Sequence, residues 1–269
     1  MEPFYVNERL RSLAADGDTF IFHPHTARTA GRTFRERVLS PVYGAQHVYC
    51  RQHVADVKPW KKLGDDDLRG FRAYTDLTIF EEIGLKRPLV CMAVLRHPVY
   101  RAVSLYWFVR RKKDHRHYAQ AQRYPLEEFY RIASDENPAY FRDLQCRRIC
   151  GQPDVNVALK TIAARYIGVG FTHNLGEFVG AMGALFGWPS IALEAPPPDA
   201  QRYDAQISPG FRDMVLKENA HDMALFDAAA NGLKLEPATA PAAWSRLRND
   251  SAVALAKIRT KLSRLASRR

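Results

Sequence analysis

Short apolar runs alternate along the chain with longer amphipathic segments. The short runs are rich in apolar and β-branched residues, and they predict strands at residues 19–23, 47–51, 89–95 and 166–171. In the longer segments apolar residues recur with the helical period, as at Val99, Val103 and Tyr106. These segments predict helices at residues 30–39, 99–113, 126–133, 175–186, 210–229 and 242–266. The alternation favours an α/β fold of three layers, with a central, mostly parallel sheet flanked by helices.

Two segments bear on how the chain is divided. Residues 189–204 include Pro196, Pro197 and Pro198 and therefore predict a loop. Near the C-terminus, Leu255, Ile258 and Leu262 form an apolar stripe surrounded by lysines and arginines. We expect one domain over residues 1–240, followed by a basic amphipathic helix in 241–269. That helix is predicted either to pack on the domain or to lie on an anionic membrane.

Composition narrows the class of protein. The chain has 269 residues, of which 46% are hydrophobic, enough for a full core. It shows neither an apolar run long enough to cross a bilayer nor a secretory leader, so a cytoplasmic location is expected. Its four cysteines do not have the spacing of metal ligands, and no metal is expected. The net charge of +11 favours an anionic partner, such as a phosphorylated or sulfated small molecule.

The first candidate site lies where the strand at 19–23 runs into the helix at 30–39. The first N–H groups of a helix have no internal partners and carry partial positive charge, so they bind phosphate well. A glycine allows an anion to approach the backbone, while arginines and hydroxyls add charge and donors. The candidate donor-binding residues are Arg28, Thr29, Ala30, Gly31, Arg32, Thr33 and Phe34.

The second candidate site lies where the strand at 89–95 runs into the helix at 99–113. Arg96 follows the strand, and Pro98 in the first helical turn costs no hydrogen bond. Ser104 lies two turns into the helix, on a face that can turn back toward Arg96. Two anion sites at the ends of two strands suit a ligand with two separated phosphate groups.

A Walker-type phosphate loop fits the first site poorly. Thr26 stands where its first glycine belongs, and Arg32 replaces its lysine. The second strand ends in Arg96 and not in the acid that would hold a metal ion.

Both sites resemble the signatures of carbohydrate sulfotransferases, in the branch that includes heparan sulfate 2-O-sulfotransferases. The family's 5′-phosphosulfate loop resembles the run His25-Thr26-Ala27-Arg28-Thr29-Ala30-Gly31-Arg32-Thr33-Phe34, with arginines in place of the family's lysine and inner threonine. The family's Arg-Asp/His-Pro-x-x-Arg-x-x-Ser-x-Tyr motif matches fully at residues 96–106. The resemblance implies 3′-phosphoadenosine-5′-phosphosulfate (PAPS) as donor, with its 3′-phosphate held by Arg96 and Ser104. It also implies transfer of the sulfuryl group to a hydroxyl of a saccharide or glycolipid.

Such a transfer needs charge stabilisation on the leaving phosphate and a base for the acceptor proton. Arg28 suits the first role as an electrostatic clamp, although an arginine is a poor acid. The base is open, because Phe71 stands where the family pattern places a histidine. Candidates for it are His47, His53, Glu81 and Glu82.

Two other functions remain open at this point. One is a nucleotide-dependent P-loop kinase, and the other is a non-catalytic protein that binds polyanions or nucleic acid, suggested by the charge alone. Nucleic acid is not the expected partner, and the sequence does not indicate the acceptor.

Overall fold

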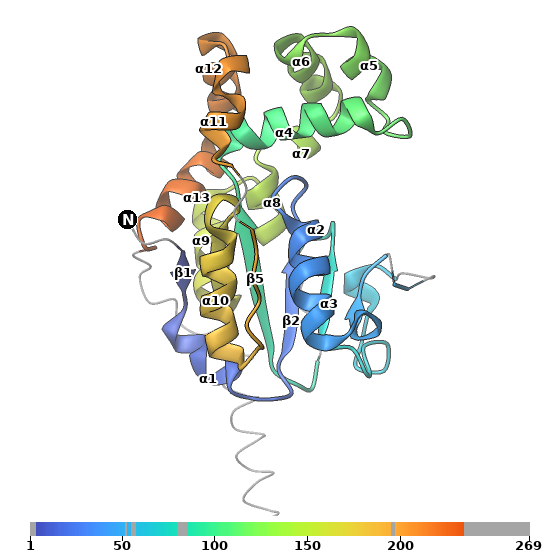
Figure 1. The fold of residues 1–269 in the computed structure, drawn as a ribbon, viewed down its shortest axis with the longest axis vertical. Coiled ribbons are helices and arrows are strands. Elements are labelled where there is room, and N and C mark those ends of the chain that lie inside the picture. Colours follow the sequence, from blue (N-terminus) through green and yellow to red (C-terminus); the bar gives the residue numbers. More distant parts are fainter. Residues whose placement is uncertain (1–3, 52, 55–57, 80–84, 195–196, 234–269) are drawn as a thin grey trace, which may run out of the picture. The chain divides into compact units, whose positions relative to one another are not determined.

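The computed structural model describes residues 4–51, 53–54, 58–79, 85–194 and 197–233, and these contain a six-stranded sheet of order β1-β6-β5-β2-β4-β3 (Figure 1). The strands are β1 (Tyr5–Val6), β2 (Phe20–Pro24), β3 (Val48–Tyr49), β4 (Ala73–Asp76), β5 (Leu89–Leu95) and β6 (Tyr166–Phe171). Strand β1 pairs antiparallel with β6, and the other neighbours pair in parallel. The prediction of an α/β fold with a mostly parallel sheet is confirmed.

The central strands follow the apolar runs closely. Strands β2 and β6 are buried along their whole length, and β5 is buried after its first residue, as expected for parallel strands covered on both faces. Strand β3 retains only two residues of the predicted 47–51, because the chain turns where Cys50 accepts hydrogen bonds from the amides of His53 and Val54. Strands β1 and β4 are too short for the sequence pattern to reveal.

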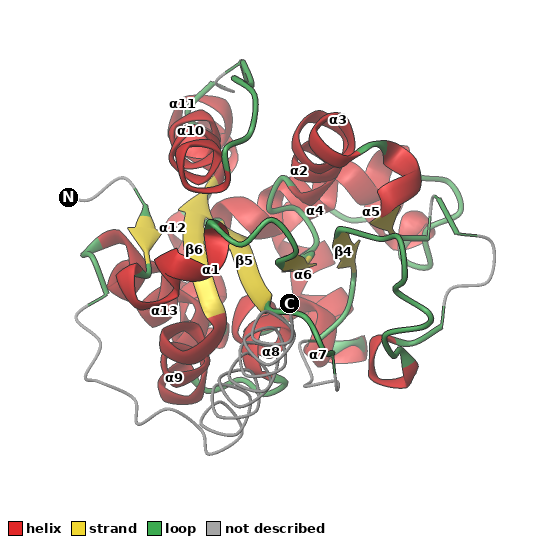
Figure 2. Ribbon diagram, turned by 90° about the horizontal axis from the view of Figure 1, so that it is seen from below, coloured by secondary structure: helices red, strands yellow, loops and turns green. Residues whose placement is uncertain are grey.

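Helices cover both faces of the sheet, which is compatible with a three-layer α/β fold (Figure 2). One face carries α10 (Leu175–Phe186) and a continuous helical segment made of α2 (Gly31–Phe34), a π-helical turn (Arg35–Leu39) and α3 (Ser40–Tyr43). The other face carries α8 (Leu144–Cys150) and α9 (Val155–Arg165), against which α13 (Ala220–Ala230) packs. Phe34 and Val38 meet Phe178 in the core on the first face.

Helix α10 lies very close to β6, because two glycines face it. A Cβ atom at Gly170 would stand 2.3 Å from Cγ of Phe178, and one at Gly168 would stand 2.8 Å from Sδ of Met182. Larger residues in the strand would therefore push this helix away from the sheet.

A second group of helices gathers beyond the carboxyl ends of the parallel strands, at the top of Figure 1. It contains α4 (Pro98–Arg111), α5 (Tyr118–Arg123), α6 (Leu126–Glu136), α7 (Pro138–Phe141), α11 (Asp199–Tyr203) and α12 (Pro209–Glu218). Val103 and Phe129 lie in its own apolar core together with Phe211. Short helical turns and α1 (Arg11–Ala14) complete the described part of the chain.

Two predictions about this region are wrong. The single helix expected at 210–229 is broken between α12 and α13 at Asn219, whose buried side chain donates to Tyr130 Oη and accepts from the amide of Asp143. The loop expected at 189–204 contains α11, since Pro198 precedes the helix and removes none of its hydrogen bonds.

In the part of the chain that the structure describes, no helix is long and apolar enough to cross a membrane. The same residues contain no group of three or more metal-ligating side chains. The predicted helix at 242–266 lies outside the described residues.

Candidate functional site

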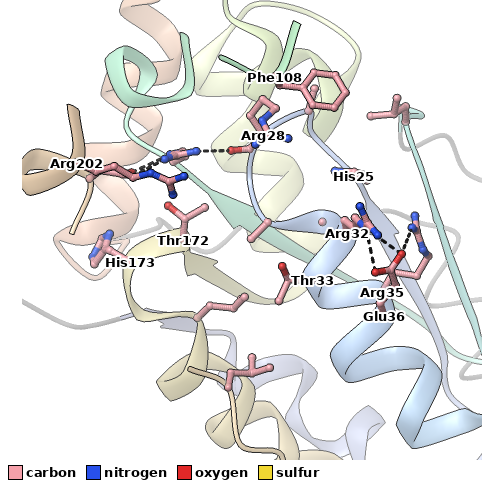
Figure 3. A pocket seen from close by; sticks show the side chains of 18 of the residues that line it. His25, Arg28, Arg32, Thr33, Arg35, Glu36, Phe108, Thr172, His173 and Arg202 are labelled. Atoms are coloured by element: carbon pink, nitrogen blue, oxygen red, sulfur yellow. Dashed lines mark hydrogen bonds and ion pairs between the residues drawn. The ribbon is translucent and has the colours of Figure 1, made fainter. Parts of the chain in front are cut away.

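The two predicted anion sites open onto one cavity of about 830 Å³ at the carboxyl edge of the sheet (Figure 3). Strands β2 and β5 pair side by side in parallel, and this brings the loops that follow them together. Of the predicted donor-binding residues, those that line the cavity are Arg28, Ala30, Gly31, Arg32, Thr33 and Arg96.

The loop after β2 has an unusual backbone. Arg28 and Ala30 have φ angles of 72° and 60°, in the left-handed region that residues with a Cβ seldom adopt. Thr29 between them is buried, and its hydroxyl donates to the carbonyl oxygen of Thr26 at 3.0 Å. This geometry delivers the chain to the N-terminus of the helical segment that begins at Gly31, where free N–H groups border the cavity.

Gly31 is required by the imidazole of His25. A Cβ atom at Gly31 would stand 2.0 Å from Cδ2 of His25, closer than any real contact. His25 also lines the cavity, and burial, followed by the charge of Arg35, lowers the pKa of its imidazole to about 4. The imidazole is therefore neutral at pH 7.

Arg28 joins the two motifs. Its Nε donates to Oγ of Ser104 at 3.1 Å, and its guanidinium lies 4.9 Å from the centre of the Phe108 ring. Burial lowers the pKa of Arg28, and the neighbouring charge of Arg96 lowers it further. The loop thus holds a partly desolvated cation close to a second one, an arrangement that favours an anion between or beside them.

Ser104 occupies a different place from the one expected. It is buried behind Arg28 and is not among the described residues that line the cavity. Its hydroxyl oxygen holds the Arg28 side chain in position, so Ser104 acts on the cavity through Arg28 in this structure.

Arg96 is buried at the end of β5, and hydrogen bonds fix both its backbone and its guanidinium. Its amide donates to Oε1 of Gln145, and its carbonyl oxygen accepts from Nε2 of the same side chain, both at 2.9 Å. The guanidinium donates through Nη1 to the carbonyl oxygen of Arg28 at 3.2 Å and through Nε to Oδ2 of Asp199 at 2.8 Å. Nη2 also contacts the Asp199 carboxylate.

The remaining loop residues have different surroundings. Arg32 and Thr33 are exposed, and Arg32 pairs with Glu36 at 3.0 Å. Phe34 is fully buried in the core and anchors the helix without reaching the cavity.

Neither predicted histidine base lies at the cavity. His47 precedes β3 and its Nδ1 contacts the carbonyl oxygen of Gly70 at 2.7 Å, whereas His53 follows β3 and contacts that of Val48 at 3.1 Å. Both are described residues, and neither lines the cavity. Glu81 and Glu82 lie outside the described residues.

Phe71, the residue that stands where the family pattern places a histidine, is described by the structure but does not line the cavity. It lies two residues before β4 begins, whereas Leu77, just past the other end of β4, is the residue that borders the cavity. The Phe71 ring packs edge-on against Tyr49.

Several residues that line the cavity lie outside the two predicted anion sites. Thr172 and His173 directly follow β6 and line the cavity. Ligand sites are expected at the carboxyl ends of parallel strands, so the position of these two residues in the sequence indicates a place in the site. Burial lowers the pKa of His173. Tyr140 and Asp199 come from distant segments, and nothing local in the sequence marks them.

The charge of the cavity is predominantly positive. Among the described residues that line it, carboxylates come from Glu36, Glu194 and Asp199, and cations come from Arg28, Arg32, Arg35, Arg96, Lys112 and Arg202. Such a site attracts anions.

Comparison of the chain with protein-family models finds no match. A search of curated proteins finds no match either.

Proposed function

We propose that this chain is a PAPS-dependent sulfotransferase with a P-loop-like fold. The observation that carries the proposal is the pairing of two motif arginines at one cavity. Arg28 and Arg96 come from separate strand–helix junctions, yet Arg96 bonds to the backbone of Arg28, and both line the same space. A ligand with two anionic groups matches this pair better than a ligand with one.

In the proposed reaction the donor's 5′-phosphosulfate lies at the N-terminus of the helix that starts at Gly31. The N–H groups there and the guanidinium of Arg28 stabilise the charge that develops on the leaving phosphate. Ser104 is a positioning residue, because its hydroxyl orients Nε of Arg28. The donor's 3′-phosphate lies toward Arg96.

The acceptor loses a proton when its oxygen takes the sulfuryl group, so a neutral base beside the helix N-terminus is needed. His25 meets both conditions in the proposed complex, since its imidazole touches Gly31 and is neutral at pH 7. His173 is the other imidazole among the described residues that line the cavity. The proposed acceptor is a hydroxyl of a saccharide or glycolipid.

Calorimetry with 3′,5′-adenosine bisphosphate and with ATP tests donor recognition. The proposal expects the bisphosphate to bind, ATP to bind at least tenfold more weakly, and Arg28→Ala and Arg96→Ala each to weaken the bisphosphate by tenfold or more. Arg69→Ala is the matched control, because its exposed guanidinium pairs only with Asp66 in the described structure, away from the cavity. Preference for ATP would favour the kinase alternative, and absence of bisphosphate binding would refute the proposal.

Transfer itself is tested with sulfate-labelled PAPS and total glycan and lipid extracts. Label is expected on a saccharide-containing fraction with the wild type and is expected to be lost with Arg28→Ala.

A further inference from the structure

The carboxylate of Asp199 occupies the face of Arg96 that an anionic ligand group would use. Nε of Arg96 donates to Oδ2 at 2.8 Å, and Nη2 contacts Oδ1 of the same carboxylate. This is the two-point geometry with which a guanidinium also binds phosphate. Nη1 is directed to the Arg28 carbonyl oxygen, so every nitrogen of the Arg96 guanidinium has an internal partner.

Burial and a neighbouring aromatic ring stabilise the ion pair between Arg96 and Asp199. The side chain of Arg96 is 9% exposed and that of Asp199 is 17% exposed, so little water screens the two charges. The ring of Tyr203, on the same short helix α11 as Asp199, lies 5.6 Å from the Arg96 guanidinium carbon. Helix α11 therefore presents both an anion and an aromatic face to Arg96.

Asp199 also lines the cavity, beside the space where a ligand would approach Arg96. A phosphate that reaches Nε and Nη2 must take the place of this carboxylate, because two anions cannot share the same two donors. A phosphate that stays outside must lie against a negative charge. In both cases the carboxylate opposes an anionic group at Arg96 and leaves a neutral group unaffected.

We infer that Asp199 is the specificity-determining residue of the Arg96 subsite, where it competes with the ligand's 3′-phosphate. This rests on the proposed function, which places that phosphate at Arg96. The carboxylate keeps Arg96 paired in the empty protein and lowers affinity for every ligand that carries an anion at this position. A nucleoside 5′-phosphate without a 3′-phosphate does not meet this competition.

The test compares Asp199→Asn with the wild type by calorimetry, using 3′,5′-adenosine bisphosphate and adenosine 5′-monophosphate. Asparagine retains an oxygen that can accept from Nε but removes the charge. We expect the bisphosphate to bind at least tenfold more tightly to the variant, and the monophosphate to change by less than twofold.

Asp204→Asn is the matched control. Asp204 directly follows α11, and its carboxylate bonds to Tyr100 and Arg212 instead of Arg96, so the variant has the same change of net charge. Equal gains in both variants would mean a long-range charge effect and would overturn the inference. Thermal unfolding is measured first, and Asp199→Ser replaces the asparagine variant if that one does not fold.

The outcomes separate the two proposals. Bisphosphate binding to the wild type with no gain in the Asp199 variants overturns the inference and leaves the proposed function standing. Binding to the wild type that becomes at least tenfold tighter in the Asp199 variant supports both proposals, whereas binding to the variant alone overturns the proposed function for the natural chain. Absence of bisphosphate binding in all variants overturns the proposed function and the inference with it.

Discussion

The two strand–helix junctions differ in what their cationic and polar groups contact. The junction after β2 presents a helix N-terminus and two exposed side chains, Arg32 and Thr33, to the cavity. The junction after β5 presents Arg96, whose donors are all turned toward other parts of the protein. The second junction matches its sequence motif fully, yet it is the one already occupied by an internal anion. A match to a motif therefore shows only which residues are present. Whether their side chains can bind a ligand depends on the groups that they already contact within the protein.

Loss of Arg96 is the largest disturbance we expect. Arg96→Ala leaves the mostly buried Asp199 carboxylate without its partner, which should lower the free energy of unfolding by about 3 kcal/mol. Urea unfolding of the single variants and of Arg96→Ala with Asp199→Asn measures the coupling. The double variant is expected to recover more than half of the loss. Additive losses would show that the two side chains do not stabilise each other.

Acidification should disturb the first junction through His25. The unfolded chain protonates this imidazole below about pH 6.5, whereas the folded protein does so only near pH 4. The unfolded state thus binds more protons between these values, and stability falls as the pH is lowered through that window. The loss is complete only below about pH 4, where it amounts to about 3 kcal/mol for this shift. Urea unfolding at several pH values, with His25→Asn for comparison, measures it, and equal pH dependence in both proteins would contradict the assignment.

A methyl group at Gly31 tests the close packing under the loop. Gly31→Ala places a carbon within 2.4 Å of three atoms of the His25 ring, so the ring or the helix start must shift. We expect a loss of about 1–3 kcal/mol in unfolding free energy, as for other overpacked sites. Adding His25→Ala should restore most of it. Failure of that second substitution to help would place the cost elsewhere than in this contact.

The smallest effect is expected at Arg32. Its side chain is 81% exposed, and it pairs with Glu36 one helical turn away. Arg32→Ala should change the unfolding free energy by less than about 0.5 kcal/mol. Its effect on bisphosphate affinity should be smaller than that of Arg28→Ala, and calorimetry makes the comparison. A larger effect than at Arg28 would reverse the order of the two arginines in the site.

Much of the sheet could be predicted because its central strands are buried runs that begin and end abruptly. The predicted strands agree with β2, β5 and β6 to within one residue at each end, and helix α10 agrees throughout. The break at Asn219 could not be predicted, because its buried hydrogen bonds join segments far apart in the chain. Strand β4 has only four residues, and its pairing with β2 and β3 defines it more than its composition does.

The candidate site, like the fold, could be predicted from the sequence only in part. Local signals predicted the loop after β2 and Arg96, because each lies at a strand–helix junction that the sequence marks. The contacts that decide their chemistry are long-range: Ser104 on Arg28, Gln145 on the backbone of Arg96, and Asp199 on its guanidinium. His47 and His53 flank a predicted strand, but the sequence does not show at which end of the sheet their side chains lie, and both bond to backbone carbonyl oxygens near β3.

The glycines of β6 have a mechanical consequence for the cavity. Because Phe178 and Met182 fill the space above Gly168 and Gly170, α10 cannot move closer to β6, and its first residue, Leu175, lies beside the cavity. Helix α11, which also contributes to the cavity lining, is five residues long and meets Arg96 through Asp199 and Tyr203. A ligand in the cavity therefore cannot gain room by pressing α10 closer to the sheet.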